Sequence, residues 1–111
     1  GFMVISGDDI VTLPITLMGG SGVISVLGLG FPKEFSQMVR FAMEKNVPEA
    51  NKIHFSLIEI TDLIFEEGNP AGIKAVYEHL GLCESTVRLP LVPASDALKQ
   101  KIAAFVKSYY A

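Results

Sequence analysis

The sequence predicts an α/β fold that opens with a β-α-β-α unit and continues with three more helices. Two continuous apolar runs, residues 2–5 and 22–26, are typical of strands that are buried on both faces of a parallel sheet. Residues 8–18 between them have helical character, and such a crossover makes the two strands parallel. After residue 26 the patterns are helical, so the sheet is followed by helices alone.

Start and stop signals place the next elements in order. Thr12 is the expected N-cap of the first helix, and Pro14 is tolerated in its first turn. Residues 28–30, Gly-Leu-Gly, are expected to form a loop, after which Pro32 opens a helix that runs to about residue 44.

The remaining helices are marked by apolar stripes and caps. The helix that starts at Asn46 and Pro48 ends at Gly68 and carries a stripe at helical spacing: Ala50, Ile53, Leu57, Ile60 and Ile64. Asn69 and Pro70 are the expected N-cap and first residue of the next helix, with Gly81 just beyond its end. Residues 83–94 are expected to be extended, and Ser95 caps the last helix.

Two parallel strands do not make a self-sufficient sheet. We therefore expect further βα units before Gly1, and we expect this chain to be a piece of a longer one. The expected organisation is residues 1–45 as the last two βα units of the sheet, and residues 46–111 as a C-terminal helical domain.

Composition excludes several classes of protein. The chain has 111 residues, a net charge of −3, 50% hydrophobic residues and no Lys/Arg cluster, which excludes disorder and disfavours a nucleic-acid partner. No apolar run approaches the roughly 18–20 residues of a membrane span, and no secretory signal is visible. Cys83 is the single cysteine, so no intrachain disulfide forms and a reducing, cytoplasmic compartment is expected. We expect Cys83 to be a small apolar residue at a helix end.

Gly7, Asp8 and Asp9 directly follow the first strand, where parallel α/β folds place their ligands. The two carboxylates could be metal ligands or general acids, or they could cap the next helix and bridge to neighbouring loops. Gly7 could expose its carbonyl group to a substrate. Sequence alone leaves these alternatives open, although two adjacent carboxylates make a poor metal site.

Other polar residues are weaker candidates. Residues 28–30 precede a helix, where phosphate can bind, but a turn alone also explains the glycines. Ile24 and Ser25 either fill the sheet or line a small apolar pocket. His54 and His79 are expected to be structural, and no Gly-x-Ser-x-Gly motif surrounds any serine.

Four stretches together resemble the C-terminal third of the dihydrodipicolinate synthase family, the 4-hydroxy-tetrahydrodipicolinate synthases. They are residues 6–9 (Ser-Gly-Asp-Asp), 22–26 (Gly-Val-Ile-Ser-Val), 65–75 and 88–91 (Arg-Leu-Pro-Leu), in that order. The resemblance covers essentially the whole chain. It implies the last two βα units of a (β/α)8 TIM barrel with a three-helix appendage.

The resemblance also implies a class I aldolase-like lyase of lysine and diaminopimelate biosynthesis. Pyruvate forms a Schiff base with a lysine of the sixth barrel strand, and the enamine attacks aspartate semialdehyde. That lysine is absent from this chain, and Lys74 does not replace it because it lies on an appendage helix. We therefore expect no catalytic residue, no cofactor and no metal here, and an isolated chain that is inactive and self-associates.

Site residues carry over only in part. Ile24 matches the residue beside bound pyruvate, and Gly7 matches a loop whose backbone approaches the substrate, with Asp8 and Asp9 shaping it. The sequence departs from the family at residues 27–30, where many members have a Thr-Ala-Asn type segment. The family's dimer–dimer contact implies a homotetramer.

Leu17 and Met18 are the residues that the resemblance assigns to this dimer–dimer contact. Two alternatives remain open at this point: a fragment of an N-acetylneuraminate lyase or keto-sugar aldolase, and a non-catalytic helical assembly module. The apolar run at residues 2–5 disfavours an independent module.

Overall fold

The computed structural model describes all residues from 1 to 111 and divides the chain into two compact units, Gly1–Ile58 and Glu59–Ala111. Helix α4 (Val47–Glu66) contributes to both. The expected division into residues 1–45 and 46–111 concerns membership of a barrel, which compactness does not test, so it stays a prediction.

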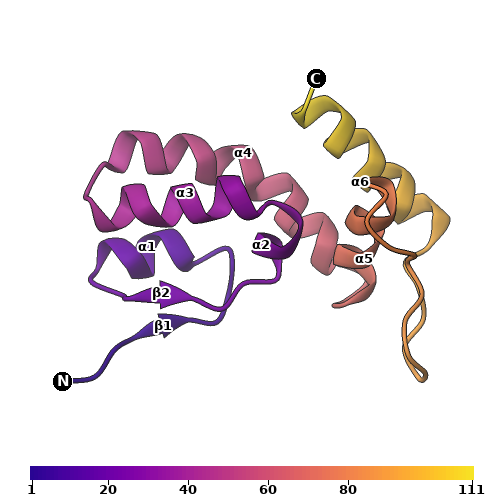
Figure 1. Cartoon of the computed structure of the whole chain (residues 1–111), viewed down its shortest axis with the longest axis horizontal. Helices are drawn as coiled ribbons and strands as arrows, with labels where there is room; N and C mark the ends of the chain where they lie inside the picture. Colours follow the sequence, from indigo (N-terminus) through magenta and orange to yellow (C-terminus); the bar gives the residue numbers. More distant parts are fainter. The chain divides into compact units, whose positions relative to one another are not determined.

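The sheet of the first unit has two strands. Strand β1 (Ile5–Ser6) pairs in parallel with β2 (Gly22–Val23), and Ser6 is the register partner of Val23. The parallel direction confirms the predicted β-α-β unit, with α1 (Thr12–Leu17) as its crossover. Helix α1 lies between the sheet and α3 (Pro32–Met43), as Figure 1 shows.

The strands are shorter than the sequence predicts. One more backbone hydrogen bond extends the pairing at each end: Ser21 N–H donates to the Val4 carbonyl (2.7 Å), and Ile24 N–H donates to the Ser6 carbonyl (3.0 Å). Phe2 and Met3 are exposed rather than buried. The predicted burial on both faces is wrong for this chain, because β1 has a neighbour on one edge only and α1 covers only one face of the sheet.

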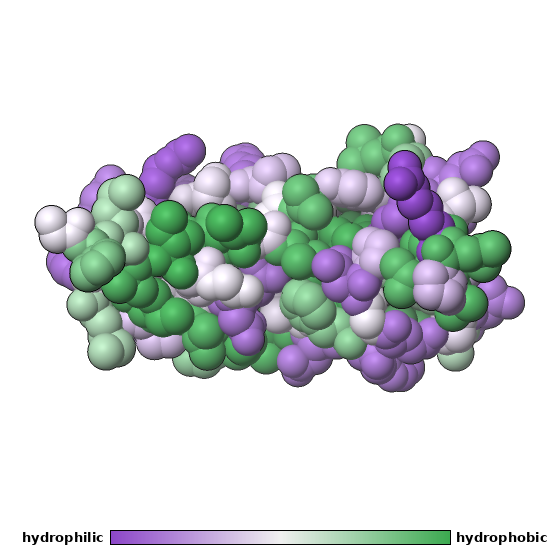
Figure 2. All heavy atoms as spheres, turned by 90° about the horizontal axis from the view of Figure 1, so that it is seen from below, coloured by the Kyte–Doolittle hydropathy of each residue, from purple (hydrophilic) through white to green (hydrophobic).

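Apolar side chains consequently lie open on the strand side of this unit. Figure 2 views the molecule from that side and shows hydrophobic residues gathered there. The exposed members from the strands and their flanks are Phe2, Met3, Val4, Ile5, Met18 and Ile24.

The helix bounds of the first unit differ from expectation at two places. Thr12 is the first residue of α1 and not its cap, because its hydroxyl donates to the Asp8 carbonyl (2.8 Å). Residues 27–30, expected as a loop, form the short helix α2 (Leu27–Gly30). The buried core of this unit comprises Leu13, Leu27, Phe31, Phe35, Met38, Ala42, Ala50 and Leu57.

The second unit is helical. It contains the end of α4, helix α5 (Ala71–His79) and helix α6 (Asp96–Tyr109), and α5 packs against α6. Ile60 and Ile64 of the predicted stripe belong to its buried core, which comprises Ile60, Ile64, Ala71, Ile73, Ala75, Val76, Ala94, Leu98, Ile102 and Val106.

The predicted helix ends at Gly81 and Ser95 are confirmed. The Ser95 hydroxyl accepts from Leu98 N–H (3.2 Å) as the cap of α6. Gly81 has a φ of 72°, and Leu82 N–H donates to the Tyr77 carbonyl (2.9 Å), which closes α5 with a Schellman motif. At the start of α5 the prediction is wrong by one residue, because Pro70 occupies the N-cap position.

Candidate functional site

The candidate site lies at the carboxyl ends of β1 and β2. Because Ser6 pairs with Val23, the next residues, Gly7 and Ile24, adjoin each other where the strands end. Gly7 and Asp8 are exposed, and the Ile24 side chain is 79% exposed. The structure therefore brings the sequence-predicted residues Gly7 and Ile24 together, with backbone and apolar surface open to a ligand.

Two buried hydroxyl groups hold the loop after β1 in place through hydrogen bonds. Ser6 and Thr12 are buried, and their hydroxyls lie 3.0 Å apart. The Ser6 hydroxyl also donates to the Asp8 carbonyl (2.9 Å), and the Thr12 hydroxyl donates to the same oxygen. The Asp8 carboxylate accepts only from Ile10 N–H within its own turn (3.2 Å). The loop is thus rigid at Asp8, whose carboxylate stays at the surface.

Asp9 differs from Asp8 because its side chain is only 4% exposed. One carboxylate oxygen accepts from the Ser25 hydroxyl, and the other accepts from the N–H groups of Val26 (3.2 Å) and Leu27 (3.0 Å). Of the alternatives left open by the sequence, bridging to a neighbouring loop describes Asp9. The helix that it caps is α2, not the next one along the chain.

The phosphate alternative for residues 28–30 is not supported. The Leu27 N–H donates to Asp9, and the Gly28 N–H donates to the Ser25 hydroxyl (2.7 Å). The Leu29 N–H donates to the Val26 carbonyl (3.0 Å). The backbone N–H groups at the start of α2 are therefore already hydrogen-bonded within the protein and are not open to a phosphate. No group of three or more His, Cys, Asp or Glu side chains is placed to hold a metal ion.

An open hollow of about 520 Å³ lies beside this site, between β2, α2 and α3. Its walls are mostly apolar, with Val23, Leu29 and Phe35 among them, and Arg40 lies at its rim. The hollow gives the first unit an apolar recess next to Ser25.

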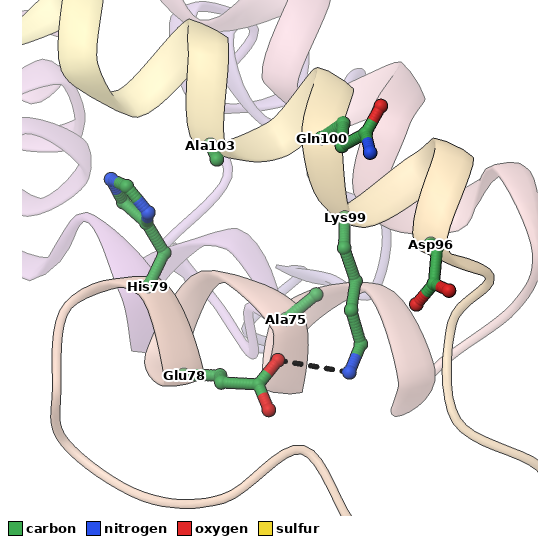
Figure 3. Close-up of a pocket in the computed structure, with 7 residues that line it drawn as sticks. All are labelled: Ala75, Glu78, His79, Asp96, Lys99, Gln100 and Ala103. Carbon is green, nitrogen blue, oxygen red and sulfur yellow. Dashed lines mark ion pairs between the residues drawn. The ribbon is translucent and has the colours of Figure 1, made fainter.

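Two polar clusters in the second unit hold the segment between α5 and α6, which leaves the helices as a long loop in Figure 1. In the first, Lys99 Nζ lies 2.9 Å from the Glu78 carboxylate and donates to the Ser85 hydroxyl (2.7 Å), which donates to Glu78 (2.9 Å). Figure 3 shows this ion pair between side chains of α5 and α6. Both residues line an open hollow of about 370 Å³. The Lys99 contact, with help from Ser85, lowers the pKa of Glu78.

The second cluster joins Glu67, just after α4, to the start of α6. The Glu67 carboxylate accepts from the Ser95 hydroxyl (2.6 Å) and the Ser95 N–H (2.9 Å), and these bonds lower the pKa of Glu67. No local sequence pattern signals this role of Glu67, because its partner lies 28 residues away. Lys74 Nζ is engaged with the Thr86 carbonyl on the same loop.

The remaining sequence candidates are surface or structural residues. His54 is half-buried, and that burial lowers its pKa. His79 and Cys83 are exposed, and Cys83 lies just beyond the end of α5, near the helix end where it was expected. Met18 is 88% exposed, while Leu17 is half-buried and its carbonyl accepts from Lys45 Nζ (3.0 Å).

A family model described as "Dihydrodipicolinate synthetase family" matches residues 1–109. The chain belongs to this family. The resemblance found in the sequence is therefore confirmed. No helix combines the length and apolar character that a membrane crossing requires.

Curated relatives are named 4-hydroxy-tetrahydrodipicolinate synthase. The 4-hydroxy-tetrahydrodipicolinate synthase of Flavobacterium psychrophilum is 55% identical over 106 residues, which are 96% of this chain and 36% of that protein. The synthase of Karelsulcia muelleri is 46% identical over 101 residues, 91% of this chain and 34% of that protein. The chain thus spans about a third of the length of these relatives.

Solved structures of the family share the fold. Dihydrodipicolinate synthase from Aquifex aeolicus matches with a TM-score of 0.92 at 38% identity, over 98% of this chain and 37% of that one. The enzyme from Thermotoga maritima matches with a TM-score of 0.94 at 33% identity, again over 98% of this chain and 37% of that one. The described elements therefore have the fold of one part of a dihydrodipicolinate synthase.

Proposed function

We propose that this chain is the C-terminal part of a 4-hydroxy-tetrahydrodipicolinate synthase that condenses pyruvate with aspartate semialdehyde. The match of the family model to residues 1–109 carries this proposal. Relatives at 55% and 46% identity bear that name, which favours the synthase over a lyase for N-acetylneuraminate, a keto-sugar aldolase or a helical assembly module.

In the proposed reaction, a lysine outside these residues forms a Schiff base with the pyruvate carbonyl and releases water. Loss of a methyl proton gives an enamine, whose carbon attacks the aldehyde carbon of aspartate semialdehyde. The chain's own Lys74 is not this lysine, because it lies on helix α5 and not on a strand. The part of the site that this chain supplies binds and orients substrate.

The binding surface is the pair of strand ends. The adjoining positions of Gly7 and Ile24 support a role beside pyruvate, with Ile24 as the apolar wall and the Gly7 backbone open to the ligand. Asp8 shapes the rim of this surface, and Asp9 acts from beneath it. No catalytic group is assigned within the chain.

The proposal extends to architecture. Residues 1–45 would be the last two βα units of a (β/α)8 barrel, and residues 46–111 a C-terminal helical domain. The free edges and the exposed apolar residues of β1 and β2 are features expected of strands taken from a larger sheet. The exposed Met18, with Leu17 beside it, would lie at a contact between dimers in a homotetramer.

The test is steady-state turnover by the full-length protein that contains this chain. We expect saturable consumption of pyruvate that depends on aspartate semialdehyde. Turnover of N-acetylneuraminate or of a keto-sugar acid in its place would refute the proposal. The chain of 111 residues is the matched negative control, because it lacks the reactive amine.

A further inference from the structure

We propose that Asp9 is a positioning residue for pyruvate binding, acting through the turn that follows β2. Its buried carboxylate fixes residues 25–27, and these fix Ile24. This inference rests on the proposed function, in which Ile24 lies beside pyruvate. Asp9 itself touches no substrate in this account, since its side chain is 4% exposed.

The carboxylate of Asp9 is directed entirely at one turn. It accepts from the Ser25 hydroxyl, from Val26 N–H (3.2 Å) and from Leu27 N–H (3.0 Å), and thus joins the loop after β1 to the loop after β2. Hydrogen bonds to an ionised acceptor are stronger than neutral ones, and a buried donor that loses its partner is costly. One side chain therefore determines the conformation of three consecutive residues.

Ser25 extends this link into α2. Its hydroxyl donates to Asp9 and accepts from Gly28 N–H (2.7 Å), so both of its functions are used. A Cβ added at Gly28 would stand 3.1 Å from the Ser25 Oγ, which indicates how closely the turn is packed. The turn has little freedom to shift while Asp9 and Ser25 remain bonded.

Ile24 lies between two fixed points. On one side its N–H donates to the Ser6 carbonyl (3.0 Å), and on the other side Ser25 is held by Asp9. Its side chain is 79% exposed, so no packing within the described chain orients it. The orientation of Ile24 toward a ligand is consequently set by the backbone on either side of it. The bond to Ser6 holds one side, and the bond between Asp9 and Ser25 holds the other.

The kinetic test uses the full-length protein. Asp9→Asn replaces an acceptor by a donor where three donors converge, and we expect the KM for pyruvate to rise about tenfold, with a smaller change in kcat. Ser25→Thr and Ser25→Val have the same shape and differ in the hydroxyl, so Ser25→Val should raise this KM more than Ser25→Thr. The exposed Asp62→Asn on α4 is the control and should keep the wild-type KM.

Amide hydrogen exchange separates this inference from the proposed function. In Asp9→Asn, the amides of residues 26–28 should lose protection while the amides of α5 and α6 keep it. If the wild-type protein does not use pyruvate, the proposed function fails. Separately, if the amides of residues 26–28 keep their protection in Asp9→Asn, the structural link between Asp9 and this turn is overturned. If the wild-type protein does use pyruvate, an unchanged KM in Asp9→Asn and Ser25→Val would overturn the positioning role.

Discussion

Gly72 on α5 lies against the backbone of Ile64 on α4, and a Cβ added to Gly72 would stand 2.0 Å from the Ile64 carbonyl oxygen. Backbone cannot move aside as a flexible side chain can, so only glycine permits this approach. We predict that Gly72→Ala lowers the free energy of unfolding by at least about 1–3 kcal/mol, the usual range for overpacking, although alanine favours helix. Denaturant unfolding measures the change.

The matched control is Gly1→Ala, since nothing lies within 4 Å of a Cβ at Gly1. A Gly72→Ala variant as stable as the wild type would show that α5 packs less closely on α4 than described.

Ser95 serves as the cap of α6 and as the partner of Glu67. Ser95→Ala should cost about 1 kcal/mol through loss of the cap alone. Ser36→Ala is the control, because the Ser36 hydroxyl donates only to the Lys33 carbonyl of its own helix (3.1 Å) and its loss should be nearly neutral. Thermal unfolding distinguishes the two variants, and equal melting temperatures would contradict the cap.

The lowered pKa of Glu78 leads us to predict a loss of folding stability in acid. Its folded-state pKa lies below the ordinary 4.5, so the folded protein binds fewer protons than the unfolded chain between these two values. The stabilisation is therefore fully present above pH 4.5 and is lost as the pH falls through the folded pKa. Unfolding measured against pH should show a shallower acid slope in Glu78→Gln and in Lys99→Met. A slope unchanged in both variants would contradict the Glu78–Lys99–Ser85 cluster.

We predict that substitution of Met18 changes the oligomeric state of the full-length protein. Met18→Glu places a charge at the proposed contact between dimers and should shift a tetramer toward dimers. Met43→Glu makes the same change at another exposed methionine, at the end of α3, and should leave the assembly intact. Sedimentation velocity measures both. Dissociation by both variants, or by neither, would remove Met18 from the contact.

Local signals predicted the helical part of the fold well. The stripe that contains Ile60 and Ile64, the glycine that ends α5 and the serine that caps α6 are all features of a few adjacent residues, and all three are confirmed. The strands were predicted too long. An apolar run shows which residues could be buried in a sheet, but whether they are buried depends on the neighbouring strands and helices.

The sequence places Gly7, Asp8 and Asp9 directly after the first strand, as the structure has them, and their role at a site stays a proposal. The hydrogen bonds that hold these residues were not predicted. Asp9 and Ser25 are 16 residues apart, and Glu67 and Ser95 are 28 apart. No local pattern signals such pairs, since only the folded backbone brings them together. That is why Asp8 and Asp9, adjacent and identical in type, looked equivalent in sequence and have different environments in the structure.

The most direct test of the proposed reaction is borohydride reduction of the full-length protein in the presence of pyruvate, followed by peptide mass mapping. We predict one pyruvate adduct on a lysine that lies outside residues 1–111 and occupies a neighbouring strand of the barrel. An adduct on Lys74 or on any other lysine of this chain, or no adduct at all, would contradict it.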